Sequence, residues 1–269
     1  MSSVNTFLGQ LAHEPAILVT VQATRGSVPR ESDAWMAVFA DKVLGTIGGG
    51  HLELQSIGQA RACLHQGVAE PVLRYSLGPS LGQCCGGEVQ LRYEAVNAAD
   101  VGMLRERLST PGMPVALFGG GHVGRALISV FGLLPVQVSW IDSRDEIFPA
   151  QLPHNVTSEH SDPVQSAVAD LVPGSRVLIM SFSHAEDLDV VAACLLRQRQ
   201  QGDLPYVGLI GSKTKWATFR HRLEVRGFTA QELAHITCPI GVPGVDGKQP
   251  EVIAVAVAAQ ILQTQSLTH

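Results

Sequence analysis

The pattern of apolar and polar positions predicts a mixed α/β domain over residues 1–110. The amphipathic segment Val4–His13 is expected to form a helix, and the apolar, β-branched run Ala16–Thr24 is typical of a buried strand. Further strands are expected over Trp35–Ala40, Lys42–Ile47, Pro71–Ser76 and Glu88–Glu94, and helices over His51–Gln66 and Asn97–Leu108.

From residue 113 to residue 269, strands alternate with helices, which predicts a Rossmann-type domain with a doubly wound parallel sheet. The turn-forming segment Ser109-Thr110-Pro111-Gly112 separates this domain (113–269) from the first one (1–110). Strands are expected over Pro114–Phe118, Val136–Ile141, Arg176–Met180 and Tyr206–Ile210, and helices over Leu188–Gln201, Lys213–Arg226 and Pro250–Thr264.

Composition narrows the class of protein. With 45% hydrophobic and 16% charged residues among 269, the chain can bury two cores, and a net charge of −5 offers no basic face for nucleic acid. No apolar segment approaches the roughly 18 residues of a membrane span, and Met1–Gln10 lacks the basic start and apolar run of a signal peptide. Five cysteines without framework spacing fit a reducing compartment, so we expect a cytoplasmic protein.

The segment Gly82-Gln83-Cys84-Cys85-Gly86-Gly87 is the most distinctive part of the chain. Adjacent cysteines form a disulfide only in a strained ring, so this pair is a poor structural staple. The flanking glycines Gly86 and Gly87 let a ligand approach the main chain, and the thiolates of Cys84 and Cys85 are soft donors suited to transition metals or to carrying sulfur. The alternative is that the cysteines are small buried apolar residues in a turn.

A second glycine-rich segment, Gly119-Gly120-Gly121-His122-Val123-Gly124, lies between an expected strand and an expected helix. The spacing of Gly119, Gly121 and Gly124 matches the dinucleotide fingerprint in its required context. The first glycine makes the tight turn, the second admits phosphate and the third allows the helix to pack on the sheet. This loop fits a nucleotide or any other phosphorylated ligand that uses a helix N-terminus.

Charged residues follow the later strands, where open parallel sheets bind ligands. Asp142 ends the next strand, about 20 residues past the first glycine, as expected of a ribose-binding acid, and Arg144 could instead meet a phosphate. After the third expected strand, His184 with Asp187 could act as a base or metal ligand, or Asp187 could cap the following helix. Lys213 either reaches a phosphate or projects into water.

Two loops of the first domain are further candidates for anion binding. Arg25 and Arg30 bracket a Gly-Ser-Val-Pro turn and could clamp an anion, or they could belong to a solvated loop. Gly48-Gly49-Gly50 precedes an expected helix and resembles an anion-accepting helix start, although a plain strand-to-helix turn explains it nearly as well.

Taken in this order, the segments resemble the XdhC/CoxI family, the accessory proteins of xanthine dehydrogenase and related molybdenum hydroxylases. The matching segments are Gly26–Arg30, Gly45–Glu53, Gly82–Gly87, Gly119–Gly124, Gly208–Lys213, Pro239–Gly241 and Lys248–Glu251. They cover both halves of the chain. The cysteine pair and the glycine-rich Rossmann loop are specific in combination.

The resemblance implies a chaperone that binds molybdenum cofactor (molybdopterin), protects it while its sulfido ligand is installed, and inserts it into apo-xanthine dehydrogenase or a related hydroxylase. It also implies a cysteine desulfurase as sulfur donor, a homodimer and no catalytic residue. The expected cofactor-binding residues are Arg30, Gly48, Gly49, Gly50, Cys84, Cys85, Gly86, Gly87, Gly119, Gly121, His122, Gly124, Asp142, Arg144, His184, Asp187 and Lys213, with Cys84 or Cys85 contacting the molybdenum.

Two rival functions and two departures from the family pattern accompany this hypothesis. One rival is an NAD(P)-dependent oxidoreductase that uses Asp142 for the ribose and His184 as acid and base, and the other is a persulfide carrier at the cysteine pair. The family often has Thr-His-x-His-x-x-Asp where this chain has Ser-Phe-Ser-His-Ala-Glu-Asp, so Phe182 replaces one of two histidines. Asp33 stands where the family usually has glycine.

Overall fold

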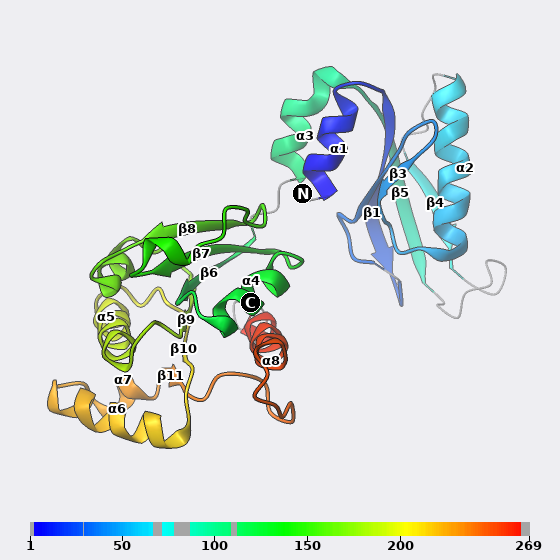
Figure 1. The fold of residues 1–269 in the computed structure, drawn as a ribbon. Coiled ribbons are helices and arrows are strands. Elements are labelled where there is room, and N and C mark those ends of the chain that lie inside the picture. Colours follow the sequence, from blue (N-terminus) through cyan, green and yellow to red (C-terminus); the bar gives the residue numbers. More distant parts are fainter. Residues whose placement is uncertain (1–2, 29, 67–71, 78–86, 109–111, 265–269) are drawn as a thin grey trace. The chain divides into compact units, whose positions relative to one another are not determined.

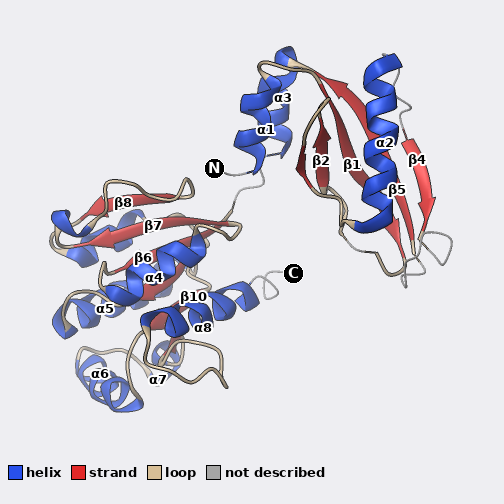
Figure 2. Cartoon of the chain, turned by 45° about the vertical axis from the view of Figure 1, so that its right-hand side comes forward, coloured by secondary structure: helices blue, strands red, loops and turns tan. Residues whose placement is uncertain are grey.

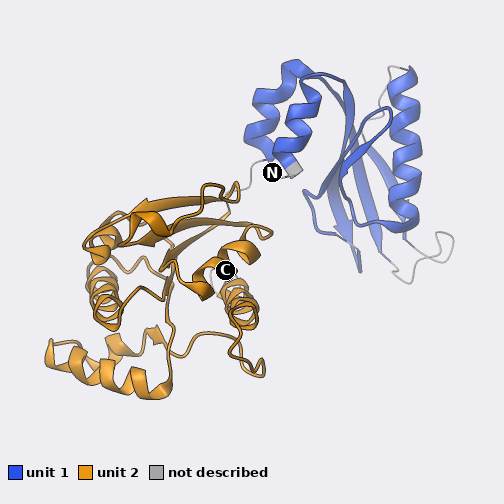
Figure 3. Cartoon of the chain, in the orientation of Figure 1, with its two compact units in different colours: residues 1–110 blue, residues 111–269 orange. Residues whose placement is uncertain are grey.

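The chain forms two compact units, residues 1–110 and residues 111–269 (Figure 3). The computed structural model describes residues 3–28, 30–66, 72–77, 87–108 and 112–264. Each unit has its own sheet and its own buried core. Among the described helices, none combines the length and the apolar character needed to cross a membrane.

The first unit is an antiparallel sheet with helices on both faces (Figures 1 and 2). Its strands, in the spatial order β3-β2-β1-β5-β4, are β1 (Ala16–Arg25), β2 (Trp35–Val38), β3 (Val43–Gly45), β4 (Val72–Ser76) and β5 (Glu88–Val96). Helix α2 (Gly50–Gln66) covers one face, and α1 (Ser3–Leu11) and α3 (Val101–Leu108), the latter preceded by the short turn η2 (Ala98–Asp100), cover the other.

Strand β1 lies in the middle of this sheet and is covered on both faces. Ile17, Val19 and Val21 pack beneath α2, whereas Ala16 and Leu18 pack against α1 and α3. Because successive side chains of a strand point to opposite faces, a strand buried on both faces needs apolar residues at nearly every position. This explains the continuous apolar run that predicts β1.

The strand register brings three loops of the first unit to one end of its sheet. Arg25, the last residue of β1, pairs with Glu88 at the start of β5, and Glu88 pairs with Ser76 at the end of β4. Strand β3 ends there too, because Gly45 pairs with Met36 near the start of β2. The loop after β1, the glycine segment after β3 and the segment between β4 and β5 therefore leave the sheet at the same end.

The second unit is a six-stranded parallel sheet with helices on both faces. Its spatial order is β11-β10-β9-β6-β7-β8, with β6 (Met113–Phe118), β7 (Val136–Asp142), β8 (Val156–His160), β9 (Arg176–Ile179), β10 (Tyr206–Leu209) and β11 (Ile236–Thr237). The chain starts in the centre and proceeds outward in both directions, so the predicted doubly wound Rossmann fold is confirmed.

Two hydrophobic clusters join the helices of the second unit to the two faces of its sheet. Helices α4 (His122–Phe131) and α8 (Pro250–Gln263) belong to one cluster. The other cluster contains residues of η4 (Val164–Asp170), α5 (His184–Gln201), α6 (Lys213–Val225) and α7 (Ala230–Leu233). The short turn η3 (Asp145–Ile147) follows β7.

The hydrophobic pattern misses both edge strands of the second unit. Strand β8 exposes four of its five residues, and β11 has only two residues, so neither produces an apolar run. Because β8 precedes it, β9 is the fourth strand of the unit rather than the third. In the first unit, β2 and β3 are shorter than the predicted strands Trp35–Ala40 and Lys42–Ile47.

Candidate functional site

The glycine loop between β6 and α4 is closely surrounded at Gly119, Gly120 and Gly124, and at Gly119 and Gly124 the nearest neighbours are backbone atoms. Gly119 has a φ of 122°, and a Cβ there would overlap the carbonyl oxygen of Met180. A Cβ on Gly124 would overlap the carbonyl oxygen of Gly119, which also accepts a 3.0 Å hydrogen bond from Trp140 Nε1. Only glycine fits at these two positions, as the fingerprint predicts.

Gly121 differs, because nothing in the described protein requires glycine there. Its φ of −67° and ψ of −172° are ordinary, and no described atom lies within 4 Å of the position that its Cβ would take. Gly121 caps α4 without a side-chain hydrogen bond, and the first turn of α4 carries no acid. The helix start, with His122 exposed beside it, is therefore open to an anion such as phosphate.

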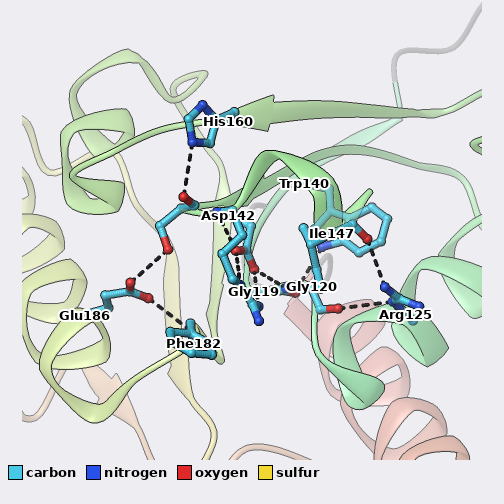
Figure 4. A network of polar contacts seen from close by, with 11 residues as sticks. Gly119, Gly120, Arg125, Trp140, Asp142, Ile147, His160, Phe182 and Glu186 are labelled. Atoms are coloured by element: carbon cyan, nitrogen blue, oxygen red, sulfur yellow. Dashed lines mark hydrogen bonds and ion pairs between the residues drawn. The ribbon is translucent and has the colours of Figure 1, made fainter. Parts of the chain in front are cut away.

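Asp142 is the acid that the fingerprint predicts, and it is buried with 1% of its surface exposed. Its Oδ2 accepts hydrogen bonds from Gly120 N at 2.6 Å and from Arg144 Nη2 at 3.0 Å (Figure 4). Its Oδ1 accepts from Arg144 N and Arg144 Nε, both at 2.9 Å. Burial alone would raise the pKa of Asp142, but the hydrogen bonds from Arg144 and Gly120 outweigh it and the pKa is lowered.

These bonds occupy the acceptor capacity of Asp142. A carboxylate offers about four lone-pair positions, and Gly120 and Arg144 fill four. A ribose hydroxyl could bind Asp142 only by displacing one of these donors. In this structure Asp142 holds the glycine loop in place and fixes the Arg144 guanidinium.

Residues that the sequence did not single out as site residues complete this edge of the sheet. Glu186 joins two loops, because its Oε1 accepts from Ser143 Oγ at 2.8 Å and its Oε2 accepts from Phe182 N at 3.0 Å (Figure 4). The Arg144 guanidinium carbon lies 4.3 Å from the centroid of the Phe182 ring. His160 at the end of β8 is 3.1 Å from the Ser143 carbonyl oxygen.

His184 and Asp187 lie at the carboxyl end of β9, but they serve separate contacts. Asp187 is buried and accepts from Ser181 N at 2.8 Å and Ser181 Oγ at 2.7 Å, and its other oxygen is 2.5 Å from Lys215 Nζ. His184 is exposed and lies edge-on to the Phe219 ring, with 6.2 Å between the ring centroids. The cap of α5 is Ser183, so Asp187 fixes the loop before the helix.

The lysine that contacts this edge is Lys215, whose side chain is 12% exposed, whereas the predicted Lys213 is exposed at the first position of α6. Besides its ion pair with Asp187, Lys215 donates to the Ile210 carbonyl oxygen at 2.9 Å. The sequence signal that points to Lys215 is a strand end followed by Gly211 and the helix-capping residue Ser212. This cap places Lys215 in the first turn of α6, because Ser212 Oγ accepts a hydrogen bond from Lys215 N. A lysine in the first turn can fold back on the strand end.

In the first unit, the helix start at Gly48-Gly49-Gly50 already holds a carboxylate of its own chain. Glu53 Oε2 accepts from Thr46 Oγ1 at 2.5 Å and from Ile47 N and Gly49 N, both at 3.1 Å. The three glycines have φ values of 122°, 78° and 67°, which allow the chain to curl around this oxygen. The predicted anion site is thus occupied by Glu53.

The described flanks of the cysteine segment lie against the loop that follows β1. Gly87 is buried, and a Cβ there would overlap the Ser27 carbonyl oxygen. Leu77 N donates to the Gly87 carbonyl oxygen at 2.7 Å. Arg30 in the loop after β1 is exposed.

Cys84, Cys85 and Gly86 lie outside the described residues. Among the cysteines that the structure describes, Cys63 and Cys194 are buried and Cys238 is half-buried, and all three are free. Burial raises the pKa of Cys194 to about 12. Across the described ranges, no group of three or more His, Cys, Asp or Glu side chains converges in a way that could hold a metal ion.

The fold and the glycine loop define an α/β protein with a Rossmann unit in which no side chain caps the start of α4. The chain belongs to the XdhC/CoxI family. The family model of the XdhC Rossmann domain matches residues 115–261, and that of the XdhC and CoxI family matches residues 10–76.

Two similar proteins bear on this assignment. Over 262 residues the chain is 29% identical to the protein named uncharacterized protein YqeB of Escherichia coli K12, which covers 94% of this chain but 44% of YqeB. The chain therefore spans less than half of that relative. A crystal structure from Bacillus halodurans, described as a xanthine dehydrogenase, has a TM-score of 0.81 at 19% identity and covers 100% of this chain and 97% of its own, which shows a shared fold.

Proposed function

We propose that this protein is an accessory factor of a xanthine dehydrogenase-type enzyme that binds molybdenum cofactor and passes it to the apo-enzyme, without turnover of its own. Family membership supports the accessory role. The observation that carries the binding role is the open start of α4 at Gly121, where the fold itself has no need for glycine. We further propose a homodimer that receives sulfur from a cysteine desulfurase.

The residues at the start of α4 fit the phosphate of the cofactor. Backbone N–H groups at a helix N-terminus attract phosphate, and a Cβ at Gly121 would fill the space that the anion needs. Asp142 keeps the loop in shape through Gly120 N. The soft thiols of Cys84 and Cys85, outside the described residues, suit the metal end. When bound, the cofactor supplies the metal and its sulfido ligand to the client enzyme.

The oxidoreductase alternative receives less support from the same edge of the sheet. Ribose recognition needs a free acceptor at Asp142, and its acceptor positions are filled. Acid–base catalysis by His184 would benefit from a carboxylate partner, but Asp187 binds Ser181 and Lys215 instead. Asp142 and Asp187 therefore hold the loops at this edge of the sheet.

The test is a comparison of Gly121→Ala with Gly102→Ala. Both glycines have room for a Cβ and an ordinary backbone, so both variants are expected to fold. We expect Gly121→Ala to lose most of the molybdenum and oxidised-pterin fluorescence that co-purify with the wild-type protein, because the added methyl group blocks the phosphate. Gly102→Ala, on α3 of the other unit, should retain both.

The proposal is wrong if the wild-type protein, produced in a host that makes the cofactor, carries neither molybdenum nor pterin and does not activate an apo-hydroxylase. Bound nicotinamide with hydride-transfer activity would instead favour the oxidoreductase. A Gly121→Ala variant with a normal melting temperature and normal cofactor content would remove the start of α4 from the site.

A further inference from the structure

Phe182 combines wide exposure with a firmly held backbone. It exposes 65% of its surface, although it lies only three residues beyond the end of the buried strand β9. Its N–H donates to Glu186 Oε2 at 3.0 Å, and the other oxygen of Glu186 accepts from Ser143 Oγ at 2.8 Å. The loop that presents the ring is thus tied both to its own helix and to the end of β7.

The Arg144 guanidinium lies against this ring and is itself fixed from behind. Its Cζ is 4.3 Å from the Phe182 centroid, and Nε and Nη2 bind the two oxygens of the buried Asp142. The hydrogen bond to Asp142 raises the pKa of Arg144, so the group stays charged. A two-point bond to a buried carboxylate restrains a guanidinium plane far better than a contact on the open surface does.

The same carboxylate connects this pair to the glycine loop. Asp142 Oδ2 accepts from both Gly120 N and Arg144 Nη2, at 2.6 Å and 3.0 Å. One oxygen of Asp142 thus links the Arg144 guanidinium to Gly120, whose loop leads into Gly121 and the start of α4. The Asp142–Gly120 contact is drawn in Figure 4. In a ligand whose phosphate binds at Gly121, the group attached to that phosphate would extend towards the Arg144 guanidinium and the Phe182 ring.

We infer that the Arg144–Phe182 pair is a stacking platform for the flat heterocycle of the ligand whose phosphate binds at the start of α4. The inference rests on the proposed phosphate site and adds which part of the ligand this edge recognises. Heterocycles such as pterins and purines stack on aromatic rings and guanidinium planes. The Arg144 side chain, 27% exposed, carries further N–H groups that suit a ring carbonyl oxygen.

Single exposed apolar residues are common on proteins, and Leu133, with 88% of its surface exposed, provides a matched example in the same unit. Phe182 differs in having a held backbone and a restrained cation against its ring.

The experiment is calorimetric titration of the full chain with three phosphorylated probes: an oxidised pterin with a phosphorylated side chain, GMP and ribose 5-phosphate. For the wild-type protein we expect at least one ring-bearing probe to bind about tenfold more tightly than ribose 5-phosphate, since one stacked base contributes about 1–3 kcal/mol and 1.4 kcal/mol is tenfold. Phe182→Leu should reduce this advantage to about twofold without changing the affinity for ribose 5-phosphate.

Two further variants complete the design. Phe182→Trp keeps a flat ring and should retain the advantage, whereas Leu133→Ala should leave all three affinities unchanged. Preference for the pterin or for GMP identifies the ring that the platform takes. Equal binding of the three probes, or an advantage that survives Phe182→Leu, would overturn the platform while leaving the phosphate site in place. Failure of all three probes to bind would overturn the phosphate site and the platform together.

Discussion

Asp142 shows how the surroundings of one carboxylate determine its role. The strand end and the distance from the first glycine predict a ribose-binding acid, and the position is indeed where the fingerprint places it. The sequence does not show that Arg144, two residues later, turns back to bind both carboxylate oxygens. Asp142 therefore links the end of β7 to the glycine loop by a hydrogen bond.

We predict that Asp142→Asn destabilises the second unit by about 2–4 kcal/mol at pH 7, because an amide cannot pair with the guanidinium and leaves donors facing donors. The folded-state pKa of Asp142 is lowered, so the unfolded chain binds the proton more readily than the folded one. The contribution of Asp142 is therefore complete above about pH 4, the unfolded pKa, and declines as the pH falls towards the lower folded pKa.

Urea denaturation of wild-type and Asp142→Asn proteins at several pH values from 7 to 3 tests this directly. The difference between their free energies of unfolding should shrink below about pH 4. Glu146→Gln, which changes a nearby carboxylate in η3, is a suitable control and should show no comparable change. A difference for Asp142→Asn that is constant across the range would contradict the ionised carboxylate as the source of stability.

At the scale of elements, two helices, α2 and α4, start at a Gly-Gly-Gly-His segment, and they differ in which groups bind at their N-termini. At α2 the chain supplies Glu53, which accepts from the residues before the helix. At α4 the first turn has no acid, and Gly124 at the corresponding place packs on the carbonyl of Gly119 instead. Nearly identical sequence segments thus give one closed and one open helix start.

We predict that Glu53→Ala destabilises the first unit by about 1–3 kcal/mol, because three donors lose their acceptor. Hydrogen exchange of the full chain should show faster exchange for residues 46–53, while the second unit is unaffected. Glu106→Ala, at an exposed position of α3, should change stability by less than about 0.5 kcal/mol. Unchanged exchange over residues 46–53 would show that Glu53 does not hold the loop.

The elements also show what the pattern of apolar residues can and cannot reveal. It predicts β1, β6, β7 and most helices, because each of them buries a continuous face or run. It misses β8, whose side chains are almost all exposed and whose pairing depends on the backbone. Side-chain partnerships such as Asp187 with Lys215 join separate strand ends, and no local pattern records them.

At the scale of the whole molecule, the two units offer different chemistry. The second unit contributes backbone and guanidinium donors at the carboxyl ends of β6, β7 and β9. The first unit gathers its motif loops at one end of its sheet, and the segment with Cys84 and Cys85 begins and ends there, between β4 and β5. The proposed phosphate site lies within the second unit alone, at the start of α4.

We predict that Cys84→Ala and Cys85→Ala each lower the molybdenum content of the purified protein while the melting temperature stays within about 2 °C of the wild type, since neither change removes a large buried side chain. Metal analysis and a thermal melt measure the two effects. Cys238→Ala, at a half-buried thiol of the second unit, is the control and should keep its molybdenum. Full metal content and normal activation of an apo-hydroxylase by both single variants would refute a role for the cysteine pair.

The engagement of both carboxylates, Asp142 and Glu186, has a consequence for selectivity. All four acceptor positions of Asp142 are filled, each oxygen of Glu186 already accepts one hydrogen bond, and the Arg144 guanidinium has further N–H groups that none of these bonds uses. These N–H groups can donate hydrogen bonds to oxygen atoms that carry lone pairs, as in phosphates and ring carbonyls. A sugar, whose hydroxyls need somewhere to donate, would gain little from them. We therefore expect the proposed site to favour oxyanions and keto groups over sugars.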